Sequence, residues 1–336
     1  MKLLIKFILF LLLFISTYAC KTDFDVIASY KEVTVVYGLL DQGDSTHYVR
    51  ITKAFLGEGN ALVYAKEPDS SLYGPELKVS LLERKQLTDV NYTTIVFDTV
   101  TIHNKDTGVF FSPDQLMYKS DAVLHPEYYY QLKAENSKTG NLVTSNTNLI
   151  QNFYLDNPKP GTKKIGFNRN VLTQQNFKWK SAVNGKKYQP VLKFFFKESS
   201  APNDTVMREI EWIMGSSTSE GVDGGDPMYA YYMNEEFYKL CESHIPYSDP
   251  VKEDAVRLRI ADHFDLIIIV VGDEFNTYLE LNGPTTGLLL EKPSYSNINN
   301  GIGVFSSHYV KQFSAGVNDI TKAALQNTTN LHFFAD

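Results

Sequence analysis

Cysteine is scarce in this chain, because only Cys20 and Cys241 occur among its 336 residues. A secreted protein with so few cysteines has no framework of disulfide bonds, so its stability must come from hydrophobic cores. Recognisable catalytic motifs are also missing, since the sequence contains no HExxH, CxxC, GxSxG or Walker A pattern. The seven histidines are scattered and never form a pair spaced for zinc. We therefore expect no enzyme of a familiar class, no catalytic residue, no metal and no cofactor.

Positive charge is also limited. Lysine and arginine number 32 against 39 aspartates and glutamates, which gives a formal net charge of -7. Binding to nucleic acid requires a clustered lysine and arginine face that neutralises phosphates, and no such cluster is visible. Nucleic acid is therefore excluded as a partner. The apolar fraction of 43% argues against disorder, and the length predicts two domains with separate cores.

The hydrophobic run at the N-terminus is too short to span a membrane. Lys2 and Lys6 precede an uncharged segment, residues 7–19, of 13 residues. A helix that crosses a bilayer needs about 20 residues. The order of a basic region, an apolar region and a small residue is that of a secretory signal, so residues 1–19 are predicted to be a cleaved signal peptide.

Ala19 followed by Cys20 resembles the lipobox of bacterial lipoproteins, although Thr17 and Tyr18 depart from its usual residues. This resemblance implies cleavage between Ala19 and Cys20 and acylation of the Cys20 thiol, with residues 20–28 as a tether. The alternative is ordinary signal cleavage with Cys20 incidental. Residues 21–25 are acidic and aromatic and resemble an export tag of Bacteroidota lipoproteins, which implies the outer face of the outer membrane; the alternative is the periplasmic face.

The mature chain alternates apolar and polar residues with the period of β-strands. Residues 128–135 show this most clearly, because Tyr128, Tyr130, Leu132 and Ala134 share one face. The spacing of strands and turns predicts an Ig-like β-sandwich over residues 29–155. Two prolines and a glycine within residues 157–161 predict the domain boundary.

The second domain, residues 162–336, resembles a fibronectin type III sandwich in the arrangement of Trp179, Tyr188 and the strand after it, with short helices inserted. Asp226 and Pro227 fit the start of a helix that would carry Tyr229, Tyr231 and Tyr232 on its first turns. Two more helices are predicted, one from Asp273 to Gly283 and one over residues 319–326. The predicted fold class is therefore mainly β, with two sandwiches.

Several segments together resemble a Bacteroidota lipoprotein family classed as domain of unknown function 4249. They are the loose lipobox, residues 33–40, YVRITKAFLG at 48–57, the strand at 128, Trp179 with Tyr188, and SNINNGIGVF at 296–305. The resemblance implies an outer-membrane lipoprotein associated with TonB-dependent transporters. It implies no catalytic residues.

A few residues remain as candidates for chemistry or modification. The tetrapeptide most suggestive of catalysis is residues 262–265, Asp-His-Phe-Asp. Strand alternation would place His263 and Asp265 on one face, with Asp262 and Phe264 on the other. The alternative is an ordinary exposed strand entrance. Gly301 and Gly303 favour a bulge or a close approach of two backbones. The residues predicted as possible O-glycosylation sites are Ser45, Thr99 and Thr205, each of which follows an aspartate.

These observations favour a non-enzymatic, lipid-anchored protein that binds a partner, with a TonB-dependent transporter as the leading expectation. The second hypothesis is a stand-alone binder of surface glycans or peptides. It depends on the clusters at 128–130 and 229–232, whose tyrosines could stack on sugar rings if exposed or simply cover the sheets. The third hypothesis is a hydrolase of unrecognised type that would depend on His263. The ligand itself is not predicted.

Overall fold

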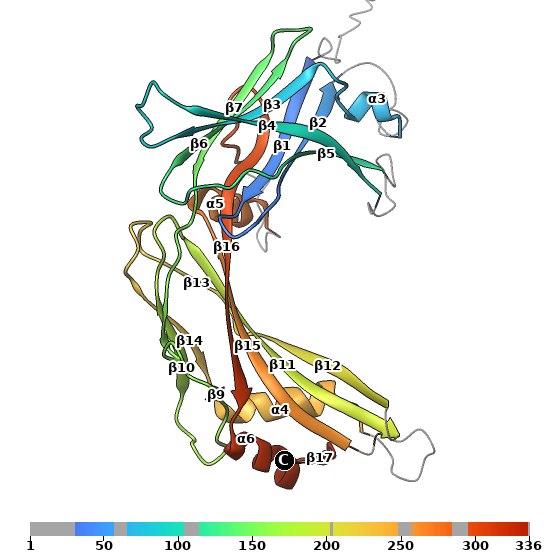
Figure 1. The fold of residues 1–336 in the computed structure, drawn as a ribbon, viewed down its shortest axis with the longest axis vertical. Helices are drawn as coiled ribbons and strands as arrows, with labels where there is room; N and C mark the ends of the chain where they lie inside the picture. Colours follow the sequence, from blue (N-terminus) through green and yellow to red (C-terminus); the bar gives the residue numbers. More distant parts are fainter. Residues whose placement is uncertain are drawn as a thin grey trace, which may run out of the picture.

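The computed structural model describes residues 31–56, 66–103, 114–201, 204–247, 256, 258–283 and 295–334. The signal peptide 1–19, with Ala19, and the tether 20–28, with Cys20, lie outside these residues and stay predictions. The described residues form a C-shaped molecule with two β-rich lobes (Figure 1), so the predicted mainly β fold is confirmed. No helix within the described ranges is both long and apolar enough to cross a membrane.

The first lobe consists of antiparallel strands that curl around one core. In β6 the alternation predicted from sequence is confirmed, since Tyr130, Leu132 and Ala134 are buried while Gln131 and Lys133 are half-buried. The elements of this lobe are β1 (Lys31–Leu40), β2 (His47–Leu56), α3 (Pro68–Ser71), β3 (Leu77–Arg84), β4 (Thr93–Ile102), β5 (Gln115–Ser120), β6 (Tyr129–Asn136) and β7 (Leu142–Asn148).

The second lobe packs a large sheet against a small one and carries two helices, α4 and α6, while α5 lies at the junction of the lobes, where Tyr278 contacts Tyr37 of β1 (Figure 1). The small sheet has the order β14-β10-β8, while β12, β11 and β15 follow one another in the large sheet. The elements are β8 (Leu155–Asn157), β9 (Lys164–Ile165), β10 (Gln175–Lys180), β11 (Lys187–Ala201), β12 (Asp204–Ile213), β13 (Ser217–Thr218), β14 (Pro227–Tyr232), α4 (Asn234–His244), β15 (Leu258–Val271), α5 (Asp273–Asn282), α6 (Asp319–Thr328) and β17 (Phe333–Phe334).

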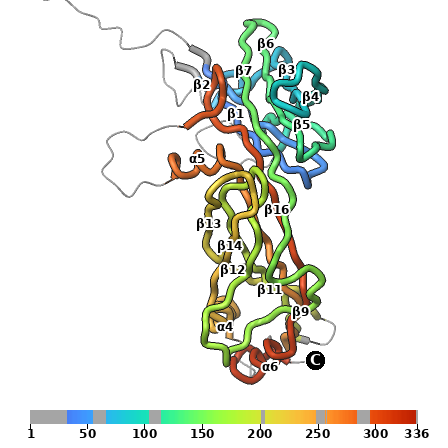
Figure 2. Tube along the Cα trace, turned by 90° about the vertical axis from the view of Figure 1, so that its left-hand side faces the viewer, coloured from blue at the N-terminus to red at the C-terminus, as the bar shows by residue number. Residues whose placement is uncertain are grey.

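The two lobes share one strand, β16 (Ile302–Val317), which runs through both of them (Figures 1 and 2). Residues 302–307 pair in parallel with β1, and residues 308–316 pair antiparallel with β15. The large sheet therefore continues from β12 at one end to β7 at the other. A bridge between Thr144 and Asn299 brings β7 back beside the entrance to β16 and closes the first lobe.

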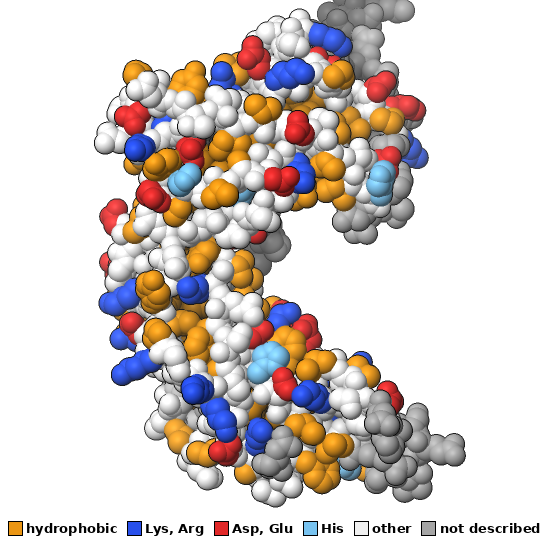
Figure 3. All heavy atoms as spheres, viewed as in Figure 1, with side chains coloured by type: hydrophobic (Ala, Val, Ile, Leu, Met, Phe, Trp, Pro, Cys, Tyr) orange, Lys and Arg blue, Asp and Glu red, His pale blue; other side chains and the backbone are white. Residues whose placement is uncertain are grey.

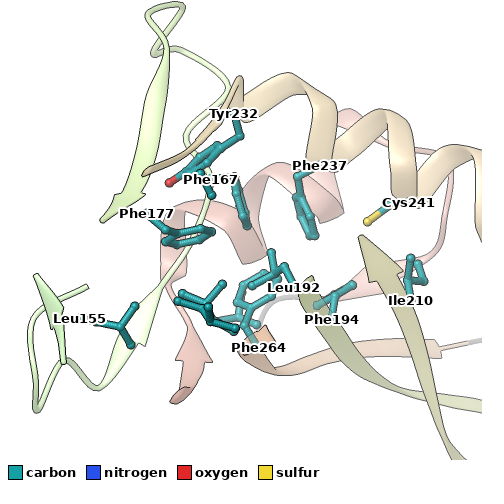
Figure 4. Close-up of a cluster of buried hydrophobic side chains, with 14 of the residues drawn as sticks. Leu155, Phe167, Phe177, Leu192, Phe194, Ile210, Tyr232, Phe237, Cys241 and Phe264 are labelled. Atoms are coloured by element: carbon teal, nitrogen blue, oxygen red, sulfur yellow. The ribbon is translucent and has the colours of Figure 1, made fainter. Parts of the chain in front are cut away.

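The protein has two hydrophobic cores, and the chain passes from the first core to the second near residue 150. Ile298 and Phe305 belong to the core of the first lobe, although the sequence places them in the predicted second domain, 162–336. In the second lobe, Trp179 and Tyr188 are fully buried with their ring centroids 6.1 Å apart. Leu192 and Phe194 join them, as predicted. Figure 4 shows Phe237 of α4 pointing into this core beside Phe194 and Phe264.

Gly303 allows the close approach of β16 to β1. Its φ is +116°, and a Cβ atom there would lie 2.0 Å from the carbonyl oxygen of Val36. Only glycine adopts this conformation without strain, and a side chain would also push the two strands apart. The predicted close backbone approach at Gly301 and Gly303 is therefore confirmed.

The predicted helix start at Asp226 and Pro227 is wrong. Residues 227–232 form β14, which pairs with β10, and α4 begins only at Asn234 after the N-cap residue Met233. Tertiary pairing decides this segment, because Met228, Ala230 and Tyr232 fill the core from the small sheet. The other two predicted helices are present as α5 and α6.

Arg259 is fully buried, although the sequence alternates it with Leu258 and Ile260, which are only half-buried. Its guanidinium donates to the Glu198 carboxylate at 2.9 Å and to the carbonyl oxygens of Leu331 at 2.7 Å and Pro246 at 3.3 Å. A buried charge is tolerated only when it is paired and its donors are satisfied. Arg259 therefore joins β11, β15 and the C-terminal segment.

We expect Arg259→Leu to lower the free energy of unfolding by about 3–5 kcal/mol, since it removes the buried partner of the largely buried Glu198 carboxylate and the donor of two carbonyls. Arg208 provides a matched control, because it donates to the other oxygen of Glu198 but its side chain is 56% exposed. Arg208→Leu should lower the free energy of unfolding by less than about 1 kcal/mol. Urea denaturation of the two variants measures both free energies of unfolding. Equal decreases in the two variants would contradict the role of Arg259 as a buried, paired charge.

Candidate functional site

The second lobe presents one open sheet face, which we call the recess floor. It consists of the side chains of β12, β11, β15 and β16 that point away from the core, and it faces the hollow between the lobes (Figures 1 and 3). Pairing across strands places Phe195 opposite both Glu209 and His263. The members of the floor used below are Lys193, Phe195, Lys197, Met207, Glu209, Glu211, Ile213, Asp262, His263, Asp265, Gln312 and Ser314.

A β-bulge in β15 places Asp262 on this floor. The register runs from Phe195 opposite His263 to Phe196 opposite Ala261, so Asp262 is an extra residue. The expectation that Asp262 and Phe264 share a face is therefore wrong. Asp262 Oδ2 lies 2.7 Å from His263 Nδ1, while Phe264 is fully buried in the core.

His263 lies between two carboxylates and against an aromatic ring. Its ring stacks on Phe195 with centroids 4.4 Å apart and an interplanar angle of 6°. The predicted face shared with Asp265 is present, since His263 Nε2 lies 3.9 Å from Asp265 Oδ1. The His263 hydrogen bond, followed by Lys197 at 3.1 Å, holds the pKa of Asp262 below its usual value.

The hydroxyl of Ser314 does not contact His263 as a nucleophile would contact its base. Ser314 Oγ donates to Asp265 Oδ1 at 2.5 Å, and Gln312 Nε2 donates to Asp265 Oδ2 at 2.9 Å. A nucleophile must lie within hydrogen-bond reach of its base, with a third group orienting that base. The two hydrogen bonds therefore hold the Asp265 carboxylate beside His263.

A shallow, open hollow adjoins His263 at the edge of this floor. It lies where β16 ends and the connection before β9 passes, and its walls include Lys163, Phe313 and Ser314. Its lining is mostly apolar, with the imidazole of His263 at one side.

The tyrosine clusters separate into buried and exposed members. Tyr232 and Tyr130 are buried, and burial raises the pKa of Tyr232 to about 12. Tyr229 and Tyr231 instead stack on each other on the outer face of β14, with centroids 5.4 Å apart. Lys178 Nζ lies 5.7 Å from the centre of the Tyr229 ring. Tyr231 is exposed and Tyr229 is half-buried, and the pair lies on a strand and not on the predicted helix.

The remaining candidate residues are separated from one another. Ser45 lies in the turn between β1 and β2, Thr99 on β4 and Thr205 on β12, and all three are exposed. Cys241 is buried in α4, where burial raises the pKa of its thiol, so it is a poor nucleophile. The structure does not gather these residues into one site.

Sequence reasoning missed one group of residues at the junction of the lobes. Asp41 and Asp44 from the turn between β1 and β2 meet His308 of β16, with one potential ligand atom of each within 4.8 Å of the others. The two aspartates are visible in the sequence as part of a turn. No local signal points to His308, because the pairing of β16 with β1 brings it there.

No protein-family model matches the chain, and no curated protein matches it. Among solved structures, it is similar to the C-terminal globular domain of an oligosaccharyltransferase from Pyrococcus abyssi, with 8% sequence identity and a TM-score of 0.23 over 84% of this chain. The chain spans less than half of that protein, 44% of its length. A likeness of this strength supports no statement about fold or function.

We expect His263→Ala to raise the pKa of Asp262 toward 3.8, because the donor that stabilises its carboxylate is lost. A lowered folded-state pKa stabilises the protein at pH values above about 3.9, and this contribution is lost as the pH falls through the lowered value. Carboxyl NMR titration measures the pKa directly. His244→Ala is the control on a distant exposed histidine, and an unchanged Asp262 titration in His263→Ala would refute the contact.

Proposed function

We propose that this protein is a non-enzymatic, lipid-anchored binding protein of the bacterial outer membrane, exposed at the cell surface, where it acts as an accessory of a TonB-dependent transporter. The observation that carries the binding role is the recess between the lobes, with its sheet face of mixed chemistry (Figure 3). The sequence of the lipobox at Cys20 and the resemblance to the domain of unknown function 4249 family support the location.

The recess floor has the mixed composition of a protein-binding surface. Lys193 lies 3.1 Å from Glu209 and 3.7 Å from Glu211, so these three charged groups of the recess floor are already paired across strands. Met207 and Ile213 are exposed among these groups, at 47% and 56%. Interfaces between proteins combine apolar contacts with a polar and charged surround.

The position of β1 favours attachment through the outer end of the first lobe. Leu40 pairs with Ser307 at the junction of the lobes, so Lys31 begins the strand at the opposite end. The ten residues between Cys20 and Lys31 can reach at most about 36 Å. Under this proposal the first lobe lies near the membrane and the second lobe projects away from it.

We expect Cys20→Ala to release the protein from the membrane fraction and to remove the mass of the acyl chains. Two or more chains give stable attachment, because each buried methylene contributes about 0.8 kcal/mol. Cys241→Ala is the matched control, since it removes the other cysteine from inside the second core. Membrane fractionation and intact mass test the anchor. An acylated mass in Cys20→Ala, or loss of attachment in Cys241→Ala, would contradict it.

We expect the protein to co-purify with a transporter after solubilisation of native membranes in mild detergent. Ile213→Glu should reduce this recovery at least about tenfold, because it places a charge on an apolar contact of the recess floor. Leu172→Glu is the control, since Leu172 is 79% exposed and is not part of this floor. Recovery is measured by quantitative mass spectrometry of the complex.

A protein that emerges alone and monomeric would overturn the transporter assignment. The second candidate function, a stand-alone glycan or peptide binder, would then be favoured if a polysaccharide or peptide changes the fluorescence of Trp179 and Trp212. The stack of half-buried Tyr229 on exposed Tyr231 supports this candidate, because aromatic faces pack against sugar rings.

A further inference from the structure

The junction cluster of Asp41, Asp44 and His308 has the composition and spacing of a metal site. Asp41 is buried at 4% exposure, Asp44 is exposed, and His308 is half-buried. His308 lies at the point where β16 leaves β1 and begins to pair with β15. The three residues therefore meet at the only strand connection that continues from one lobe's sheet into the other's along the described path.

The distance between Asp41 and His308 suits two ligands of one ion better than a hydrogen bond. His308 Nδ1 lies 3.5 Å from Asp41 Oδ2, beyond the usual 2.7–3.2 Å of an N–H···O bond. The Nδ1 atom is buried and has no hydrogen-bond partner among the described residues. Tetrahedral Zn²⁺ binds nitrogen and oxygen at about 2.0–2.2 Å, which places two ligands about 3.4 Å apart.

The surroundings of Asp41 also leave its charge poorly balanced. Its carboxylate accepts backbone hydrogen bonds from Gly43, at 2.7 Å, and from Val310, but no lysine or arginine among the described residues pairs with it. A bound cation would compensate for the desolvation of this carboxylate.

A second histidine beside the same turn also has an unpartnered nitrogen. His47 is 2% exposed, and its Nε2 contacts the Ala122 carbonyl oxygen at 3.0 Å. Its Nδ1 is buried without a partner in the described structure, and the ring lies within electrostatic range of Asp44 and Asp41. Two unsatisfied imidazole nitrogens near two carboxylates are unusual, because buried polar atoms are normally hydrogen-bonded.

We propose that Asp41, Asp44 and His308 bind one divalent transition-metal ion, of the class that includes Zn²⁺, at the junction of the two lobes. One imidazole and two carboxylates suit Zn²⁺ and its neighbours, whereas Ca²⁺ and Mg²⁺ prefer oxygen ligands throughout. The exposure of Asp44 leaves a route for the ion from solvent, and water completes the coordination.

The ion would fix the relative position of the lobes. The turn that carries both aspartates already contacts the second lobe, because Gln42 Nε2 donates to the Ile150 carbonyl oxygen at 2.7 Å. Beyond His308, Tyr309 and Lys311 both contact Asn152 Oδ1, at 3.1 and 2.8 Å. A metal that joins Asp41, Asp44 and His308 would connect this turn to β16, and so stabilise the recess that both lobes enclose.

We test the site on the full chain in detergent after removal of metals with EDTA. Titration with Zn²⁺ alone, followed by calorimetry, should give one ion per chain and a raised melting temperature. His308→Ala and Asp41→Asn should each weaken zinc binding by more than tenfold, since even outer-shell partners of a metal contribute about 10–100-fold. His103→Ala is the matched control, because His103 Nδ1 also lies beside an aspartate, 2.7 Å from Asp114 Oδ1, but His103 belongs neither to the junction cluster nor to the recess floor.

Asp44→Asn keeps the test informative if the buried variants fail to fold, since Asp44 is exposed and its amide retains the shape of the side chain. It should fold like the wild type, as measured by circular dichroism, and should also bind zinc more than tenfold more weakly. The proposal is overturned if the wild type binds no zinc, if Asp44→Asn binds it with unchanged affinity, or if His103→Ala abolishes the binding.

Discussion

The structure depends on the pairing of β16 with β1. Residues 302–307 of β16 complete the sheet of the first lobe, and the next residues of the same strand enter the sheet of the second lobe. A strand that belongs to two sheets cannot rotate freely between them, because its backbone hydrogen bonds are fixed on both sides. Gly303 permits the close parallel contact that this arrangement requires. The angle of the C-shaped molecule follows from that strand.

The shared strand also determines what the recess can contain. It places Gln312 and Ser314 beside Asp265, so the second lobe presents an ordered set of polar groups toward the hollow. Phe195 and His263 stack within this set, and a β-bulge adds Asp262. Side chains held in this way lose little freedom when a partner binds, which lowers the entropic cost of recognition. The same strand carries His308 to the junction, where the recess begins.

Local patterns predicted the strands more reliably than the faces or the partners of those strands. The alternation in β6 gave its buried side correctly, because one face of that strand packs on a single core. Strand alternation failed at Asp262, because a bulge changes the register there. The local helix signals failed for residues 227–232, where an aspartate followed by a proline resembles the start of a helix. Sheet pairing stabilises β14 more than the local signals favour a helix.

The sequence by itself determined the mainly β class, the candidate lipobox, the buried Trp179 and Tyr188, and the absence of familiar catalytic motifs. Each of these features depends on residues that are close in the sequence, so the composition and the periodicity of apolar residues are sufficient to find it. Only the tertiary structure decided that Ile298 and Phe305 serve the first core, that Arg259 is buried, and that Asp41 and Asp44 meet His308. Those outcomes depend on contacts between segments that are distant in the sequence. The register of the sheets determines these contacts, and a single sequence does not contain that register.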